Sequence, residues 1–317
     1  MTTPELQPIV PMQPVQVDKP FDDPRYTYQI KWDGVRVLTY LDINGLQLFN
    51  RKLNPRTFIY PEMQEMKKWL RATSVILDGE MVALGADGKP SFSAILRRDL
   101  VKGGEKVRLL ARNSPVFYMV WDVLYHDGEW LVDKPLSQRQ ERLREVVTPS
   151  QLVKLVEDHP SGIELFRVME QQGMEGVVAK EREGKYRIGE RNATWKKIKT
   201  FRTIHTVAGG AAIKSGLVNS LLLGVYNEDG LLYVGKAATG LSAADIQALT
   251  GFTNQLPEQK SPFLNPPRFS RTMYDKVVWF PPTIVVEVKF LEWTSDLTLR
   301  DPVIQGFRDK PPGECRF

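Results

Sequence analysis

Short runs of apolar and β-branched residues, several with the two-residue period of a β-strand, recur along the chain and predict a protein rich in strands. Tyr26, Tyr28 and Ile30 alternate with polar residues just before an Asp-Gly turn. Residues 38–49 contain two such runs joined by Asn44-Gly45, which is the signal of a type I′ hairpin. Further strands are expected at residues 75–84, 116–124 and 176–180.

Helical spacing is confined to a few segments. Met63, Met66 and Leu70 predict a helix over residues 61–72. Ser137 and Gln140 have the spacing of a capping box that opens a helix through residue 147. Two more helices are expected at residues 151–157 and 163–172, and the proline-rich residues 1–20 are expected to lie extended over the surface.

The pattern changes after about residue 201, where glycine turns separate short strands. These strands are expected at residues 204–207, 221–226, 231–236 and 284–290. Ser242 and Asp245 predict a capped helix through residue 250. About five short strands with one helix are typical of a small barrel of OB type. The sequence therefore predicts two domains, an α+β domain over residues 1–202 with mixed and antiparallel sheets, and an OB-fold β-barrel over residues 203–317.

Charge is distributed unevenly along a chain of otherwise ordinary composition, with 42% hydrophobic and 26% charged residues. Residues 203–317 carry 11 basic and 11 acidic residues, so the formal charge of +5 lies entirely upstream. Residues 180–202 hold nine basic and three acidic residues and are expected to bind the phosphates of a polyanionic partner. A second basic patch, residues 97–112, is expected to be either a contact with the backbone of the same partner or a solvated surface.

Residue counts exclude several classes of site. A single cysteine, Cys315, excludes a disulfide framework and a cysteine-built zinc site. The three histidines are scattered, which argues against a histidine-built metal centre. No apolar run approaches the roughly 18 residues of a membrane span. We therefore expect no membrane partner and a place in the cytoplasm.

Charged residues interrupt several predicted strands, where polar groups need a partner or a chemical role. If the interrupted strands belong to one sheet, these residues converge on one site. Its expected members are Lys31, Asp33, Arg36, Arg51, Glu80, Trp121, Asp122, Glu175, Lys180, Lys197 and Lys199. Alternation places Lys197 and Lys199 on the same strand face as Trp195.

A nucleophilic lysine among cations and carboxylates suits attack on the α-phosphate of a nucleotide, assisted by a divalent metal. An amine attacks only when it is neutral, and neighbouring cations favour the neutral form. The same cations stabilise charge that develops on phosphoryl oxygens. Carboxylates suit Mg²⁺, a hard ion that takes oxygen ligands, and an aromatic side chain can stack on a base.

Six blocks in this order resemble the ATP-dependent DNA ligases, within the superfamily of covalent nucleotidyltransferases. They are residues 31–36 (KWDGVR), 78–80 (DGE), 117–122 (FYMVWD), 175–180 (EGVVAK), 195–199 (WKKIK) and 299–310 (LRDP…FRDK). Residues 87–92, 221–224, 234–236 and 288–294 further resemble ligase domains of bacterial end-joining ligases of the ligase D type. The resemblance runs from about residue 12 to the C-terminus and implies an ATP-grasp-like adenylation domain followed by an OB fold.

The resemblance also implies roles for individual residues. Lys31 would carry AMP through a phosphoramide bond, Glu175 would position the metal together with Glu80, and the cofactors would be ATP with Mg²⁺ or Mn²⁺. The expected nucleotide contacts are Gln29, Ile30, Arg36, Arg51, Glu80, Trp121, Lys197, Lys199, Arg300, Arg308 and Lys310. Within this set, Glu80 would hold the ribose, Trp121 would stack on adenine, and the last three would orient pyrophosphate.

Two departures from the family pattern affect these expectations. Gln29 stands where relatives often have glutamate, and it should still pair with an adenine edge. The final block is one residue shorter than usual, so either Arg308 and Lys310 together or Lys310 alone would reach the triphosphate.

The implied activity is sealing of 5′-phosphate/3′-hydroxyl breaks in duplex DNA through a lysyl-AMP intermediate. The alternatives are an RNA ligase, a capping-type nucleotidyltransferase, and a catalytically silent protein that binds DNA ends. Expected partners are nicked or broken duplex DNA and an end-binding repair protein of the Ku type. The expected state is a monomer in the bacterial cytoplasm, associated with the nucleoid.

Overall fold

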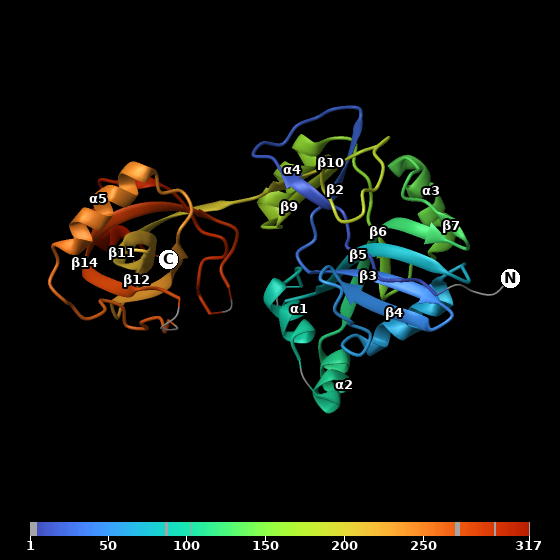
Figure 1. Cartoon of the computed structure of the whole chain (residues 1–317), viewed down its shortest axis with the longest axis horizontal. Coiled ribbons are helices and arrows are strands. Elements are labelled where there is room, and N and C mark those ends of the chain that lie inside the picture. Colours follow the sequence, from blue (N-terminus) through green and yellow to red (C-terminus); the bar gives the residue numbers. More distant parts are fainter. Residues whose placement is uncertain (1–4, 86–87, 102, 270–272, 295, 317) are drawn as a thin grey trace. The chain divides into compact units, whose positions relative to one another are not determined.

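The computed structural model describes residues 5–85, 88–101, 103–269, 273–294 and 296–316. The chain divides into two compact units, Met1–Thr200 and Phe201–Phe317 (Figure 1). Within the described residues, no helix is long and apolar enough to cross a membrane. Lys102 of the second basic patch, and Asp87 of the run 87–92, lie outside the described residues.

The first unit contains two sheets, one mixed and antiparallel in its pairings and the other mainly antiparallel, as predicted for this domain. The four-stranded sheet has the order β1 (Gln13–Gln16), β10 (Arg191–Lys199), β9 (Gly176–Glu181) and β2 (Tyr26–Ile30). The six-stranded sheet has the order β4 (Gly45–Asn50), β3 (Val35–Asp42), β5 (Val75–Ala83), β6 (Val116–His126) and β7 (Glu129–Trp130), with β8 (Val153–Leu155) paired to β6.

These two sheets pack against each other through one face each. Leu38, Tyr40 and Ile76 of the six-stranded sheet share a buried cluster with Trp195 of β10. The condition that the interrupted strands belong to one sheet is not met, because local strand patterns do not encode which strands pair. The consequence is that charged residues reach a common region from two facing sheets.

Helices cover the outer faces of both sheets. They are η1 (Pro61–Trp69), α1 (Phe92–Asp99), α2 (Gly104–Asn113), α3 (Leu136–Val146) and α4 (Gly162–Gln172). Helix α4 lies on β2 and β9 (Figure 1), and its Leu165 and Met169 are buried with Tyr28. Met63 and Met66 of η1, a 3-10 helix, are buried against the six-stranded sheet.

One predicted helix is absent, and one predicted helix is present with a cap other than the one expected. Residues 151–157 contain strand β8, which pairs in parallel with β6. Helix α3 begins at Leu136 with Pro135 at its N-cap and without a capping hydrogen bond, while the Ser137 hydroxyl lies 3.4 Å from Glu183. Tertiary pairing and proline geometry decided these two segments.

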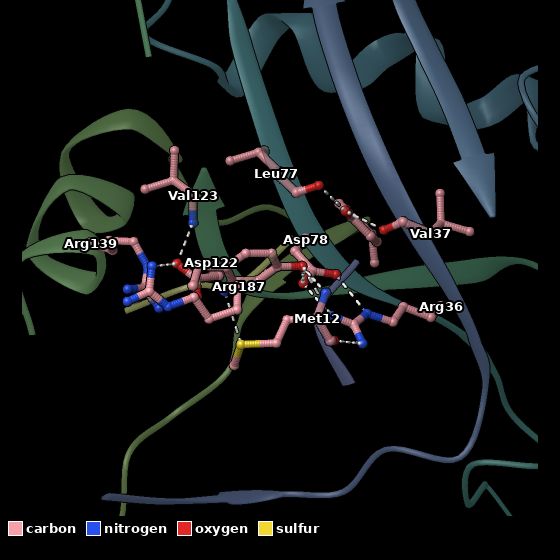
Figure 2. A network of polar contacts seen from close by, with 11 residues as sticks. Met12, Arg36, Val37, Leu77, Asp78, Asp122, Val123, Arg139 and Arg187 are labelled. Atoms are coloured by element: carbon pink, nitrogen blue, oxygen red, sulfur yellow. Dashed lines mark hydrogen bonds and ion pairs between the residues drawn. The ribbon is translucent and has the colours of Figure 1, made fainter. Parts of the chain in front are cut away.

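The N-terminal segment is partly buried, contrary to the expectation that it lies over the surface. Leu6 and Met12 belong to the buried cluster between the sheets, and β1 forms the edge of the four-stranded sheet. The Met12 carbonyl accepts a hydrogen bond from Arg36 at 2.6 Å. Figure 2 shows this contact in a polar network that also contains the buried pairs Arg36–Asp78 and Arg139–Asp122.

The second unit is a five-stranded sheet with one helix. Its order is β13 (Leu231–Ala237), β12 (Leu217–Tyr226), β11 (Arg202–Lys214), β14 (Lys276–Phe290) and β15 (Val303–Arg308). Thr239, just after β13, forms a bridge with Val303, so the two edges of the sheet meet. Helix α5 (Ala243–Asn254) packs on β12 and has the predicted capping box of Ser242 and Asp245. Strands β11, β12 and β14 are longer than the sequence predicted. A short 3-10 helix that was not predicted, η2 (Pro312–Glu314), follows β15.

Candidate active site

Lys31 lies at the end of β2 and is held by its backbone. Its N–H donates to the Gly176 carbonyl at 2.9 Å, so pairing with β9 continues one residue past the strand. Its Nζ lies 2.6 Å from Oε2 of Glu175, the residue directly before β9. The side chains of Lys31 and Glu175 are 21% and 8% exposed, so the amine is fixed by a shielded carboxylate while keeping access to solvent.

Two glycines permit the close approaches that build this region. A Cβ atom on residue 34 would lie 2.2 Å from the Met81 carbonyl oxygen. Because Gly34 has no Cβ, the start of β3 can lie directly against β5. Gly176 has a φ of +140°, and its Cβ would lie 2.0 Å from the Ile198 carbonyl oxygen. Both motif glycines are therefore required by backbone contact.

Strand register gathers the predicted phosphate-binding residues on one face of the four-stranded sheet. Opposite residues in antiparallel strands project to the same side. Gln29 pairs with Val178, which pairs with Lys197, and Gly176 pairs with Lys199. Trp195 pairs with Lys180, while Ile198 packs on the other side with Tyr28. The predicted common face of Trp195, Lys197 and Lys199 is confirmed by this register.

The cations on this face lie close enough to affect each other. Burial lowers the pKa of Lys197, and the nearby charges of Lys199 and Lys31 lower it further, against an opposing effect of Glu175. Lys197 and Lys199 are both half-buried. The face is therefore a shielded cluster of positive charge beside Lys31, which suits an anionic ligand.

Glu80 comes from the facing sheet, where β5 places it opposite Arg36 of β3. Burial raises the pKa of Glu80 to about 8. The charges of Lys31 and Arg36 oppose this shift, and those of Glu175 and Asp33 add to it. The charges of Lys31 and Glu175 therefore act on Glu80, and its place in a common site stays a prediction.

Arg36 makes its contacts within the protein. Its guanidinium forms a paired hydrogen bond with Asp78, at 2.9 and 2.5 Å, and contacts the Tyr186 hydroxyl at 3.2 Å. Arg36 also lies 5.4 Å from the ring centroid of Trp121. The structure thus gives Arg36 a structural role, and its contact with a nucleotide stays a prediction.

Trp121 is half-buried and has a second cation beside it, Lys180, which was among the residues expected to converge on the site. Nζ of Lys180 lies 5.0 Å from the Trp121 ring centroid and 4.2 Å from that of Trp195. Lys180 is 2% exposed, and its Nζ has no hydrogen-bond partner among the described residues. Burial lowers the pKa of Lys180 to about 7, although Asp122, Asp78 and Asp158 oppose this shift. Its position opposite Trp195 in the β9–β10 register is what brings Lys180 here.

Gln29 lies on the same face as Lys31, two residues earlier, and is 2% exposed. Its Nε2 donates to Oδ1 of Asp158 at 2.9 Å. Sequence reasoning missed Asp158, because it follows β8 and lies just after the segment mistaken for a helix. Ile30 has its side chain on the opposite face, in the cluster of Tyr28 and Val177, and Arg51 is exposed just after β4. Nucleotide contacts of Gln29, Ile30 and Arg51 stay predictions.

The predicted pyrophosphate-binding residues of the second unit have acidic partners there. Arg300 lies 2.7 Å from Glu292, Arg308 lies 2.9 Å from Glu287, and Lys310 lies 3.4 Å from Glu314. Their side chains are 20%, 41% and 31% exposed. These ion pairs keep the cations near the protein surface, and such pairs contribute little to stability.

Metal ligation has one candidate pair. No group of three or more His, Cys, Asp or Glu residues with metal-binding geometry occurs in the part of the chain that the structure describes. Glu80 and Glu175 are oxygen donors, and the charge of Glu175 makes ionisation of Glu80 more costly, so a divalent cation held by the two carboxylates would relieve this cost. The donor chemistry therefore fits Mg²⁺ or Mn²⁺.

Comparison with known proteins identifies the family of the chain. Residues 12–199 match the family "ATP dependent DNA ligase domain", and residues 214–311 match "ATP dependent DNA ligase C terminal region". The chain belongs to the ATP-dependent DNA ligase family. Its units are therefore a nucleotidyltransferase domain and an OB-fold domain, as predicted.

Individual relatives refine this placement. The chain is 31% identical over 295 residues to "Multifunctional non-homologous end joining DNA repair protein LigD" of Mycobacterium tuberculosis, covering 92% of this chain and 37% of that protein. It is 30% identical to a "DNA ligase" of Thermococcus fumicolans, covering 91% of this chain and 53% of that protein. The chain thus spans about a third to a half of the curated relatives it matches. These names do not favour the RNA ligase, capping or silent alternatives.

A solved structure gives the same result for the fold. "Mycobacterial DNA ligase D complexed with ATP and MES" matches with a TM-score of 0.55 and 30% identity, covering 97% of both chains. The predicted resemblance to ligase domains of the ligase D type is confirmed.

Proposed function

We propose that this chain activates ATP through Lys31 and then seals 5′-phosphate/3′-hydroxyl breaks in duplex DNA. The observation that carries the proposal is the pair of Lys31 and Glu175, 2.6 Å apart, beside the cationic face of Lys197 and Lys199. Membership of the DNA ligase family supports the reaction class.

The first step forms a bond between Nζ of Lys31 and the α-phosphorus of ATP, and breaks the bond from that phosphorus to pyrophosphate. The amine must give up the proton of its ammonium form before it attacks. Glu175 is the carboxylate within hydrogen-bond distance, so it orients the amine and can accept that proton. In the later steps AMP moves to the 5′-phosphate, and the 3′-hydroxyl displaces it.

The other site residues bind and orient the nucleotide. Lys197 and Lys199 neutralise charge on the α-phosphate oxygens, Glu80 holds the ribose hydroxyls, and Trp121 stacks on the base. Gln29, Ile30, Arg36 and Arg51 complete the nucleoside and phosphate contacts. Arg300, Arg308 and Lys310 of the OB-fold unit orient the leaving pyrophosphate.

Glu80 and Glu175 would hold Mg²⁺ or Mn²⁺ through their carboxylate oxygens. When bound, the ion supplies Lewis-acid polarisation of a phosphoryl oxygen. Binding of the ion also stabilises the ionised form of Glu80, whose pKa is otherwise raised by burial.

Contact with DNA is proposed for the exposed part of the basic segment 180–202. Arg182 and Arg191 are exposed, whereas Lys180 is buried. In the second basic patch, Arg98 is 0% exposed and bonds to Glu62 and to the Ile59, Leu110 and Ser114 carbonyls, so only its exposed neighbours such as Arg108 remain available. A Ku-type end-binding partner, a monomeric state and association with the nucleoid are further parts of the proposal. Similarity to LigD, a non-homologous end joining DNA repair protein, supports the first of these.

Labelling with α-³²P-ATP tests the central step. Wild-type protein is expected to become labelled, and Lys31→Ala is expected to lose the label completely because it lacks the amine that forms the bond with the α-phosphorus. Lys196→Ala is the matched control, since Lys196 lies on the same strand as Lys197 but faces Phe21 and Tyr26. Label that persists in a folded Lys31→Ala variant contradicts the assignment.

A sealing assay tests the substrate. Nicked duplex DNA is expected to be joined at the expense of ATP, and a nicked duplex without the 5′-phosphate is not. Failure to join nicked DNA by a protein that accepts the label would refute the DNA ligase proposal while leaving nucleotidyl transfer intact.

A further inference from the structure

The structure fixes which end of the Gln29 side-chain amide donates a hydrogen bond and which end can accept one. Its Nε2 lies 2.9 Å from Oδ1 of Asp158, and Nε2 of Gln140 lies 3.0 Å from the same oxygen. A carboxylate offers only acceptors, so the amide nitrogen of Gln29, rather than its oxygen, must face Asp158.

Asp158 is held in place from two sides. Tyr28 and His159 exchange backbone hydrogen bonds of 3.1 and 2.8 Å, which fixes the backbone of Asp158 opposite Gln29 at the edge of β2. On the side of α3, Arg144 lies 3.4 Å from Oδ2 of Asp158. The carboxylate therefore cannot turn away without losing several contacts.

The side-chain oxygen of Gln29 is the atom left for a ligand. Within the described residues, Gln29 donates to Asp158, and its oxygen receives no hydrogen bond. Gln29 lies on the sheet face that carries Lys31 and Lys197. A base that reaches this face from a phosphate at Lys31 thus meets an acceptor.

We infer that Asp158 fixes the orientation of the Gln29 amide, and thereby selects a purine with a 6-amino group over one with a 6-oxo group. The inference rests on the proposed function. The 6-amino group of adenine donates to the Gln29 oxygen, whereas the 6-oxo group of hypoxanthine or guanine would face it acceptor to acceptor. Asp158 is thus a positioning residue that acts through Gln29.

Comparison of ATP with ITP tests this directly, because inosine replaces the 6-amino by a 6-oxo group without adding a 2-amino group. The measurement is kcat/KM for labelling of Lys31 with each nucleotide. Wild-type protein is expected to prefer ATP by about 10- to 100-fold, the usual effect of leaving one shielded hydrogen-bonding group unpaired.

The informative variant is Asp158→Asn. An asparagine amide can donate as well as accept, so Gln29 becomes free to turn, and the ATP/ITP ratio is expected to fall about tenfold or more. Asp158→Ser, which also donates and accepts, is expected to give the same loss and serves if Asp158→Asn fails to fold. Gln140→Met is the matched control: it removes the contact of α3 with the same oxygen but leaves Gln29 and Asp158 intact, and its ratio should equal that of the wild type.

A double variant separates positioning from a general structural effect. Gln29→Met alone should lower the ATP/ITP ratio, and addition of Asp158→Asn should lower it no further. An unchanged ratio in Asp158→Asn and Asp158→Ser, a further fall in the double variant, or equal use of ATP and ITP by the wild type would overturn the inference. Absence of labelling with both nucleotides in the wild type would instead refute the proposed function.

Discussion

Replacement of Lys180 by methionine is expected to make folding stability less dependent on pH. Lys180 is 2% exposed, and its amine lies between the rings of Trp121 and Trp195 without a hydrogen-bond partner among the described residues. Its carboxylate neighbours Asp78 and Asp122 have their own partners in Arg36 and Arg139, so they do not become unpaired when Lys180 is lost. Methionine retains the apolar stem of the side chain and removes the charge.

The magnitude follows from the lowered pKa of Lys180. Burial takes it from 10.5 to about 7. One pH unit corresponds to about 1.4 kcal/mol, so the charged amine costs the folded state about 5 kcal/mol below pH 7. Contacts with two indole rings favour the ammonium by about 1 to 2 kcal/mol and reduce this figure.

The direction of the pH effect on folding stability depends on how many protons the folded and unfolded chains bind. Between pH 7 and 10.5 the unfolded chain keeps a proton that folded Lys180 has released, so a rise in pH favours folded wild-type protein. Lys180→Met lacks this effect. Its stability advantage over the wild type should therefore shrink by about 2 to 3 kcal/mol between pH 7 and pH 9.

Urea denaturation followed by circular dichroism and tryptophan fluorescence, at pH 6, 7, 8 and 9, measures this difference. Lys106→Met, which replaces an exposed lysine on α2, is the control and should stay within about 0.5 kcal/mol of the wild type. A difference between wild type and Lys180→Met that is constant from pH 7 to 9 would show that the amine is not buried as described.

Three further predictions concern the scaffold and DNA binding. Arg139→Met should lower the free energy of unfolding by about 3 to 5 kcal/mol in urea denaturation, because it leaves the fully buried Asp122 unpaired; a loss below 1 kcal/mol would contradict the buried pair. Gly176→Ala should disrupt the contact of β9 with β10 and abolish labelling by ATP, because its Cβ would overlap the Ile198 carbonyl; normal labelling would be inconsistent with that backbone contact. Binding of nicked duplex DNA should weaken steeply with salt, and Arg191→Gln should reduce the slope by about one; a salt-independent binding constant would rule out the phosphate contacts.

Local sequence identified most elements that have their own signals. Asn44-Gly45 gave the β3–β4 hairpin, and Ser242 with Asp245 gave the cap of α5. Errors arose where distant contacts decide the conformation. Residues 153–155 form a strand only because β6 offers them a partner, and Pro135 rather than Ser137 begins α3.

The motif residues, their order and their alternation within strands were available from the sequence alone, and with them the reaction class. These properties depend on residue type and on the two-residue period of a strand, both of which are local. The two-residue period is the reason why the sequence assigned one strand face to Trp195, Lys197 and Lys199.

Only the tertiary structure decided which of these groups meet. Lys31 and Glu175 are separated by 143 intervening residues, and their contact depends on the pairing of β2 with β9. The burial of Lys180 between two indoles and the contact of Asp158 with Gln29 likewise arise from strand pairing and from the packing of two sheets. Such pairings are set by the total burial and hydrogen bonding of the fold, which no local pattern of residues contains.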